Sequence, residues 1–135
     1  MDDCIFCRIV AGEIPASKVS EDEDVLAFLS IEAINTGHTL VIPKNHAEEF
    51  HELEDDSYYK LMGVVQKVAK SLKKTYKPVR VGLMVQGFEV AHAHIHVVPL
   101  HEVTDITSKK LLEGTALHPT PEALDAEAAN IKQNL

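Results

Sequence analysis

The stretch Ala91-His92-Ala93-His94-Ile95-His96-Val97-Val98-Pro99 has a histidine at positions 92, 94 and 96. Alternate side chains of a β-strand point to the same face. This spacing therefore predicts a strand with three imidazoles on one surface and small or branched residues on the other. Solvated strand faces more often carry threonine, lysine or glutamate. Three clustered titratable rings thus indicate a site of chemistry rather than a histidine-rich wet face.

The three histidines cannot all bind one metal ion. A strand rises about 3.3 Å per residue, which puts the Cα atoms of His92 and His96 about 13 Å apart. Both rings would have to come within about 2.1 Å of a zinc ion. At least one of the three histidines must therefore do other work.

The composition is typical of one soluble globular domain over residues 1–135, with 45% hydrophobic and 25% charged residues. The 21 acidic and 13 basic residues give a net charge of -8, so we expect no nucleic-acid partner and no anionic membrane surface. No apolar run is long enough to span a bilayer, and Asp2 and Asp3 stand where a signal peptide would be basic. The expected compartment is the cytoplasm.

Hydrophobic periodicity and turn residues predict the elements of the fold. In chain order we expect a short helix over 4–10, strands over 18–21, 25–29 and 39–43, a long helix over 55–76, strands over 80–85 and 92–100, and a C-terminal helix from 121 to about 133. Asp55 or Asp56 can cap the long helix, and residues 86–89 are typical of a hairpin link. Between residues 103 and 119 the signal is weak. This order predicts an α+β fold on a five-stranded antiparallel sheet.

Both cysteines fall in Cys4-Ile-Phe-Cys7, which in a reducing compartment suggests a metal or redox pair. A redox pair should follow a strand, and this one does not, so a metal is favoured over the alternative of buried thiols that bind nothing. A structural zinc ion needs two further ligands. The candidates are His38, His46, His51, His92, His94, His96, His101 and His118. Counting alone cannot choose, although His46 and one of the triad histidines could complete a Cys2His2 site.

A histidine that binds no metal is mostly neutral at pH 7 and can act as a nucleophile or base. Its attack on phosphorus gives a phosphohistidine that water hydrolyses readily, which splits one hard displacement into two easier ones. Such a nucleophile needs its other ring nitrogen held as N–H by a carbonyl or carboxylate. The central ring, His94, has polar neighbours on both sides and is the natural choice.

The same residues resemble the histidine triad (HIT) family of nucleotidyl hydrolases and transferases. The resemblance extends to the bacterial zinc-binding branch, which is similar to nucleoside phosphoramidate hydrolases. It covers residues from about 4 to 100, and the tail from about 101 is not diagnostic. The stretches that match are the Cys4–Cys7 motif, Gly12–Pro15, Val25–Leu29, Gly37–His46 and His92–Val98.

The resemblance implies roles for individual residues. It implies that His94 is the nucleophile that becomes nucleotidylated and that His96 and His38 support the phosphate and the triad. It further implies a structural zinc ion, a purine-nucleotide substrate cleaved at its α-phosphate, and a homodimer whose two sheets join edge to edge. The implied zinc ligands are Cys4, Cys7, His46 and His92, and the implied apolar wall around the base and sugar is Phe6, Ile9, Ile14, Phe28 and Ile31.

The sequence departs from its relatives at two places in the substrate site. Ser30 stands where relatives have an aspartate for the ribose hydroxyls, so ribose affinity should fall. The loop before the triad is shortened, and Gln86 either replaces part of a lost amide contact or is a plain turn residue. Glu89 would repel a phosphate unless it is protonated, turned away, or paired with a cationic leaving group.

These departures leave two alternatives open. One is a nucleotide-binding sensor or a zinc-braced interaction module with little catalysis. The other is a metal-dependent phosphoesterase, which needs an open coordination position that a Cys2His2 site would fill.

Overall fold

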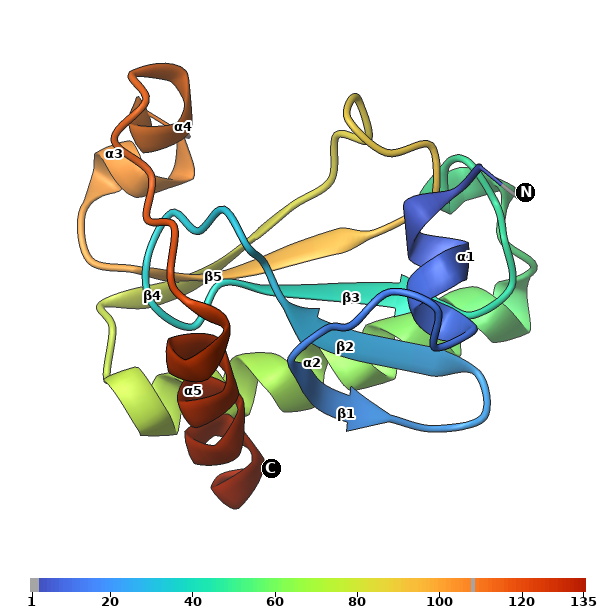
Figure 1. The fold of residues 1–135 in the computed structure, drawn as a ribbon, viewed down its shortest axis with the longest axis horizontal. Helices are drawn as coiled ribbons and strands as arrows, with labels where there is room; N and C mark the ends of the chain where they lie inside the picture. The colour runs from blue at the N-terminus through green and yellow to red at the C-terminus, as the bar shows by residue number, and fades with distance from the viewer. Residues whose placement is uncertain (1–2, 108) are drawn as a thin grey trace.

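A five-stranded antiparallel sheet organises the chain in this computed structural model, which describes residues 3–107 and 109–135. The strand order is β1-β2-β3-β5-β4, so β1 and β4 are the edges (Figure 1). The strands are β1 (Lys18–Glu21), β2 (Val25–Leu29), β3 (Thr39–Pro43), β4 (Arg80–Met84) and β5 (Ile95–Leu100). The predicted α+β class, the five antiparallel strands and the two main helices are confirmed.

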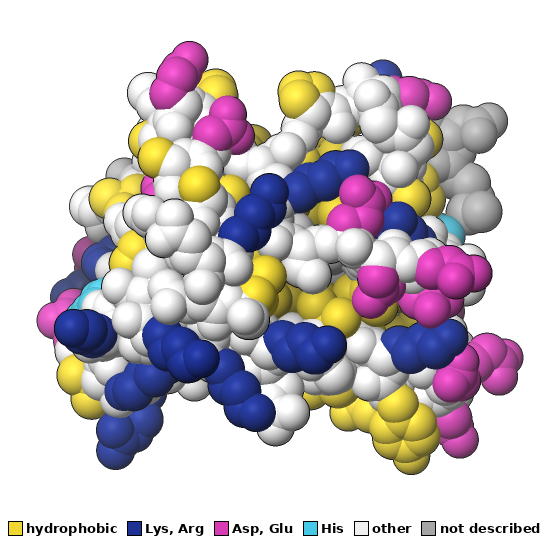
Figure 2. Space-filling model, turned by 90° about the horizontal axis from the view of Figure 1, so that it is seen from below, with side chains coloured by type: hydrophobic (Ala, Val, Ile, Leu, Met, Phe, Trp, Pro, Cys, Tyr) yellow, Lys and Arg dark blue, Asp and Glu magenta, His cyan; other side chains and the backbone are white. Residues whose placement is uncertain are grey.

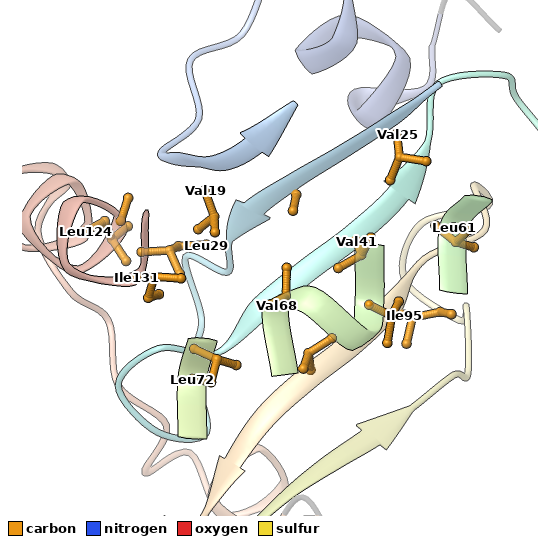
Figure 3. Close-up of a cluster of buried hydrophobic side chains, with 14 residues drawn as sticks. Val19, Val25, Leu29, Val41, Leu61, Val68, Leu72, Ile95, Leu124 and Ile131 are labelled. Atoms are coloured by element: carbon orange, nitrogen blue, oxygen red, sulfur yellow. The ribbon is translucent and has the colours of Figure 1, made fainter. Parts of the chain in front are cut away.

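Helices α2 (Asp55–Tyr76) and α5 (Pro121–Gln133) cover one face of the sheet. The apolar stripe of α2 packs on alternate sheet residues such as Val41 and Val97, and Leu124 and Ile131 of α5 extend the same core (Figure 3). The side of α2 that faces away from the sheet is exposed to solvent. Figure 2 shows lysine and arginine side chains along this face and acidic ones gathered toward one end.

Within residues 3–107 and 109–135, the helices on the other face of the sheet lie at its two ends (Figure 1). Helix α1 (Ile5–Val10) packs Phe6 and Ile9 onto the β2–β3 end. At the opposite end lie the short helices α3 (Val103–Ile106) and α4 (Lys109–Leu112), and α3 packs on β5 (Figure 1). His96 of β5 lies across from Leu40 on one neighbouring strand and Met84 on the other, so its side chain belongs to this partly covered face.

Three sequence predictions are wrong in detail. Strand β5 begins at Ile95 rather than His92, so only His96 of the triad lies in a strand, and the β4–β5 connection spans residues 85–94 instead of a four-residue hairpin link. The chain leaves the ladder there because Ala93 N–H donates to Ala47 O at 2.7 Å. The N-cap of α2 is Glu54, without a side-chain cap bond, instead of Asp55 or Asp56.

The end of α2 follows the prediction. The helix stops at Tyr76, and Lys77 adopts a left-handed conformation with φ of 50° just before Pro78. Helices α3, α4 and the 3-10 helix η1 (Phe50–Glu52) were not predicted. None of the helices within residues 3–107 and 109–135 has the length and apolar character to cross a membrane.

Candidate active site and metal centre

Four cysteine and histidine side chains from distant parts of the chain meet beside α1. The ligand atoms of Cys4, Cys7, His46 and His92 all lie within 4.8 Å of one another. The Cys4 Sγ to His92 Nδ1 distance is 3.4 Å, and Cys7 Sγ lies 3.3 Å from His46 Nδ1 and 3.5 Å from His92 Nδ1. The two histidine Nδ1 atoms are 3.2 Å apart.

This cluster fits a tetrahedral zinc ion. Zinc–sulfur bonds of about 2.3 Å and zinc–nitrogen bonds of about 2.05 Å imply sulfur–nitrogen separations of about 3.6 Å and a nitrogen–nitrogen separation of about 3.3 Å. The three sulfur–nitrogen separations and the one nitrogen–nitrogen separation given above agree with these values within a few tenths of an ångström. His92 Nε2 donates to Pro43 O at 2.8 Å, which leaves Nδ1 as the ligand atom. Burial lowers the pKa of His92, which favours the neutral ring that a metal requires.

His94 has a single tautomer set by its neighbour. Its Nδ1 lies 2.6 Å from the backbone oxygen of His92. Because a carbonyl only accepts, Nδ1 must carry the hydrogen, and Nε2 of the neutral ring keeps an unprotonated lone pair. The Phe6 ring packs edge-on against the imidazole, with centroids 5.1 Å apart and an interplanar angle of 88°. The ring is therefore fixed in the form that a nucleophile needs.

His38 and His96 form a second hydrogen-bonded chain. Ile34 N–H donates to His38 Nδ1 at 3.1 Å, so the hydrogen of the neutral His38 ring is on Nε2. That nitrogen lies 2.9 Å from His96 Nδ1, which must accept. The hydrogen of His96 is thus on Nε2.

Burial keeps both of these rings neutral. It lowers the pKa of His38 to about 3 and that of His96 to about 4, with smaller contributions from a neighbouring histidine ring in each case. Among the described residues, His96 Nε2 is buried and has no hydrogen-bond partner. A buried N–H without a partner is costly. It lies on the ring that packs edge-on against His94, with centroids 5.0 Å apart and an interplanar angle of 61°. The two adjoining rings therefore carry one lone pair, on His94 Nε2, and one donor without a partner, on His96 Nε2.

The residues expected to line the substrate site are divided between core and surface. Phe6, Ile9 and Phe28 are buried and belong to one cluster, against which Ile14 packs half-buried. Ile31 is 77% exposed, so in this chain its side chain is not part of that buried wall. Ser30 is buried, and its hydroxyl donates to Glu32 O at 2.7 Å, which occupies its only hydrogen.

The loop that precedes the triad is largely exposed. Gln86 and Glu89 both have exposed side chains. Phe88, between them, is 91% exposed, which is unusual for an aromatic residue. Val90 turns inward and packs against the Phe6–Phe28 cluster. No hydrogen bond or ion pair of Gln86 or Glu89 is present among the described residues.

The family description that matches this chain is the HIT domain, over residues 11–103. The chain belongs to the HIT family. The match includes the triad, His38 and His46 but ends before most of the segment that follows β5.

Relatives within the HIT family support this assignment. An uncharacterized HIT-like protein of Methanocaldococcus jannaschii is 48% identical over 103 residues, which are 73% of this chain and 80% of that protein. The adenosine 5'-monophosphoramidase hnt1 of Schizosaccharomyces pombe is 41% identical over 97 residues, which are 71% of this chain and 73% of the yeast protein.

Solved HIT structures share the fold. A HIT-like protein involved in cell-cycle regulation from Bartonella henselae, crystallised with an unknown ligand, matches with a TM-score of 0.85 and 30% identity, covering 100% of this chain and 98% of that one. A Zn-bound histidine triad protein from Mycobacterium smegmatis matches with a TM-score of 0.78 and 24% identity, covering 98% and 93%. At this identity, the similarity to the Mycobacterium smegmatis protein shows a shared fold only.

Sequence reasoning missed three backbone groups of the HIT site. The carbonyls of Pro43 and His92 and the N–H of Ile34 each fix the tautomer of a site histidine. Main-chain donors and acceptors have no side-chain signature. The only available signal was that Pro43 ends a predicted strand just before His46.

Proposed function

We propose that this chain hydrolyses nucleoside phosphoramidates or related adenylyl conjugates through a covalent nucleotide on His94. The observation that carries the proposal is the tautomer of His94, whose Nδ1–H is committed to the His92 carbonyl while Nε2 remains a free lone pair. The similarity to the yeast adenosine 5'-monophosphoramidases, at 41% and 36% identity, supports a purine-nucleotide substrate.

In the first step His94 Nε2 attacks the α-phosphorus. The bond from phosphorus to the leaving nitrogen breaks, and the departing amine takes a proton from solvent. The attacking ring keeps its Nδ1 hydrogen and becomes positively charged. The His92 carbonyl, 2.6 Å away, stabilises that charge. In the second step water attacks the same phosphorus and loses a proton to solvent. The bond between phosphorus and His94 Nε2 breaks, which releases the nucleoside monophosphate and returns the lone pair to the neutral ring.

His96 supports the charge that develops on the phosphoryl oxygens. Its Nε2–H has no partner among the described residues, so a phosphoryl oxygen would satisfy a donor that is already desolvated. His38 donates to the other side of the His96 ring and keeps that hydrogen in place. One well-placed donor of this kind is worth about 3 kcal/mol of transition-state stabilisation.

The metal site has a structural part in this proposal. Cys4, Cys7, His46 and His92 would hold a zinc ion with all four positions filled by protein, so the ion would brace the fold and offer no open position for catalysis. These ligands link α1, the segment after β3 and the residue that orients His94. The fixed ligand set also makes the metal-dependent phosphoesterase the weaker alternative.

A homodimer is part of the same proposal. Strand β4 is one edge of the sheet, and along the described chain it pairs only with β5. Val79, Leu83 and Val85 are exposed at this edge, which is the kind of apolar, unpaired strand that a second copy can cover. Sedimentation equilibrium, with Leu83→Lys as the variant and Leu112→Lys as a surface control, tests this assembly. A monomeric wild type would contradict it. The cytoplasmic location and the absence of a nucleic-acid partner remain predictions.

Turnover of adenosine 5'-phosphoramidate tests the function. We expect the wild type to release AMP and the His94→Ala variant to bind the nucleotide while releasing none. His101→Ala, which changes an exposed histidine outside the triad, serves as the control and should remain active. Binding without turnover in the wild type would favour the nucleotide sensor instead.

A further inference from the structure

The loop that carries His38 is held by the segment beyond the region that matches the HIT domain. Ala33 and Leu117 exchange two backbone hydrogen bonds, of 2.9 and 2.8 Å. The Lys110 ammonium donates to Ile34 O at 3.2 Å and to Asn35 Oδ1 at 2.6 Å. Three consecutive loop residues are therefore tied to residues 110–117.

A buried carboxylate fixes Lys110 in this position. Asp105 is 1% exposed, and its Oδ1 lies 3.3 Å from Lys110 Nζ. Its Oδ2 accepts from the Asn35 amide at 2.9 Å and from the backbone N–H groups of His101 and Glu102. Burial by itself would raise the pKa of Asp105, but these hydrogen bonds lower it to about 2. Lys110 thus makes two hydrogen bonds to the loop and an ion pair with Asp105, and we call this Asp105–Lys110 pair the clamp.

The clamp contacts Ile34 and Asn35, and both of these residues form a hydrogen bond with His38. Ile34, whose carbonyl accepts from Lys110, donates its N–H to His38 Nδ1 at 3.1 Å. Asn35, which also accepts from Lys110, receives the His38 backbone N–H on its carbonyl at 3.1 Å. The Ile34 N–H is what makes Nδ1 of His38 an acceptor, and this in turn sets the tautomer of His96.

We propose that Lys110, held by Asp105, is a positioning residue for the His38–His96 pair and therefore acts in the reaction proposed above. The expected effect on kcat rests on that proposed function, whereas the expected effect on the tautomers of His38 and His96 does not. Lys110 does not touch the reacting atoms. It holds the loop that keeps the hydrogen of His96 on Nε2, where a phosphoryl oxygen would accept it.

Without the ammonium, the Ile34 carbonyl and the Asn35 amide lose their shared donor, and Asp105 keeps a buried charge with one partner fewer. The loop can then shift, and the Ile34 hydrogen bond to His38 lengthens. A misplacement of this kind lowers the rate of the chemical step without removing contacts to the substrate. The expected signature is a fall in kcat with little change in KM.

The test compares Lys110→Met with Lys109→Met in the full-length, metal-loaded protein. Methionine keeps most of the aliphatic stem and removes only the ammonium, and Lys109 is an exposed lysine one position earlier. For Lys110→Met we expect kcat on adenosine 5'-phosphoramidate to fall between about tenfold and about 100-fold. We also expect the imidazole ¹⁵N–¹H signals of His38 and His96, recorded without substrate, to show mixed tautomers. Lys109→Met should match the wild type in both measurements.

The kcat and the imidazole signals together distinguish a failure of the positioning role from a failure of the proposed function. An unchanged kcat in Lys110→Met, or a reduced kcat with unchanged His38 and His96 signals, would overturn the proposal. If the wild type itself releases no AMP, the proposed function fails, while unchanged imidazole signals in Lys110→Met would still overturn the positioning role. If Lys110→Met does not fold, Lys110→Gln, which keeps an N–H donor but no charge, is judged by the same criteria.

Discussion

The backbone oxygen of His92 lies 2.6 Å from Nδ1 of His94, while the His92 side chain faces Cys4, Cys7 and His46. One residue therefore joins the metal centre to the candidate nucleophile. Its ring offers Nδ1 to a metal, its Nε2 is anchored on Pro43, and its carbonyl selects the tautomer of the next histidine. A metal ion bound to the His92 ring would therefore act directly on the geometry of the His94 ring.

Metal content is the first prediction. We expect one zinc ion per chain by elemental analysis, and Cys7→Ser should lose most of it because a hydroxyl replaces a thiolate ligand. Loss of the ion should lower Tm by roughly 5 to 10 °C, since the ligands join α1 to two distant segments. His51→Ser removes an exposed histidine near His46 and is the control. Equal zinc in wild type and Cys7→Ser would contradict the assignment.

Stability against pH is the second prediction. The pKa values of His38 and His96 are lowered from 6.5 to about 3 and about 4, so below pH 6.5 only the unfolded chain takes up these protons. The free energy of unfolding should therefore fall as the pH drops from about 6 to about 4, by up to roughly 2.7 kcal/mol per pH unit for two protons. Urea titrations at several pH values give the free energy of unfolding of the wild type and of His38→Asn. The variant lacks the His38 proton, so its free energy of unfolding should depend less steeply on pH. An equal dependence of the free energy of unfolding on pH in the two proteins would rule out a low pKa for His38.

The third prediction concerns the Nε2–H of His96, which has no hydrogen-bond partner among the described residues. His96→Ala should lower kcat about 100-fold with a small change in KM, because the donor acts on charge that develops in the transition state. Glutamine has an amide nitrogen near the position of Nε2, so His96→Gln should recover part of the loss. Steady-state kinetics of the three proteins provide the measurement. If the glutamine variant is no better than the alanine variant, the donor role is wrong.

Sugar selectivity gives the fourth prediction, which depends on the resemblance to relatives with an aspartate at position 30. The Ser30 hydroxyl donates to Glu32 O and can only accept from a ribose hydroxyl. Ser30→Asp should raise the ratio of kcat/KM for the ribose substrate over its 2',3'-dideoxy analogue by about tenfold. Ser30→Asn has a similar size without the charge and should change the ratio less. If the ratio is the same in all three proteins, the side chain at position 30 does not contact the ribose hydroxyls.

Local patterns in the sequence predicted most of the fold. Strands β1, β2 and β3 and helix α2 have the expected bounds, because their apolar spacing is regular and Pro78 limits the helix. The start of β5 was wrong because alternation alone cannot show that Ala93 leaves the ladder to pair with Ala47. Helices α3 and α4 escaped prediction because each is only four residues long and their contacts with Ile34 and Asn35 join residues 70 to 76 positions apart.

The candidate site was predictable in its side chains but not in its connections. The cysteine spacing indicated a metal, and the resemblance selected His46 and His92, which the structure brings together with the thiols. The wall residues differ in burial, with Ile31 exposed and Phe6 buried, so their contact with a nucleotide stays a prediction. The link from Lys110 to His38 joins residues 72 positions apart through backbone atoms, which no local pattern encodes.

The covalent intermediate is the most direct test of the account. Wild-type protein mixed briefly with adenosine 5'-phosphoramidate labelled at phosphorus, and quenched in alkaline detergent, should carry label that is stable to base and lost in acid. Peptide mapping should locate the label on His94, and it should be absent from the His94→Ala variant. Rapid AMP release with no labelled protein at any quench time, or label mapped to another residue, would contradict the central claim.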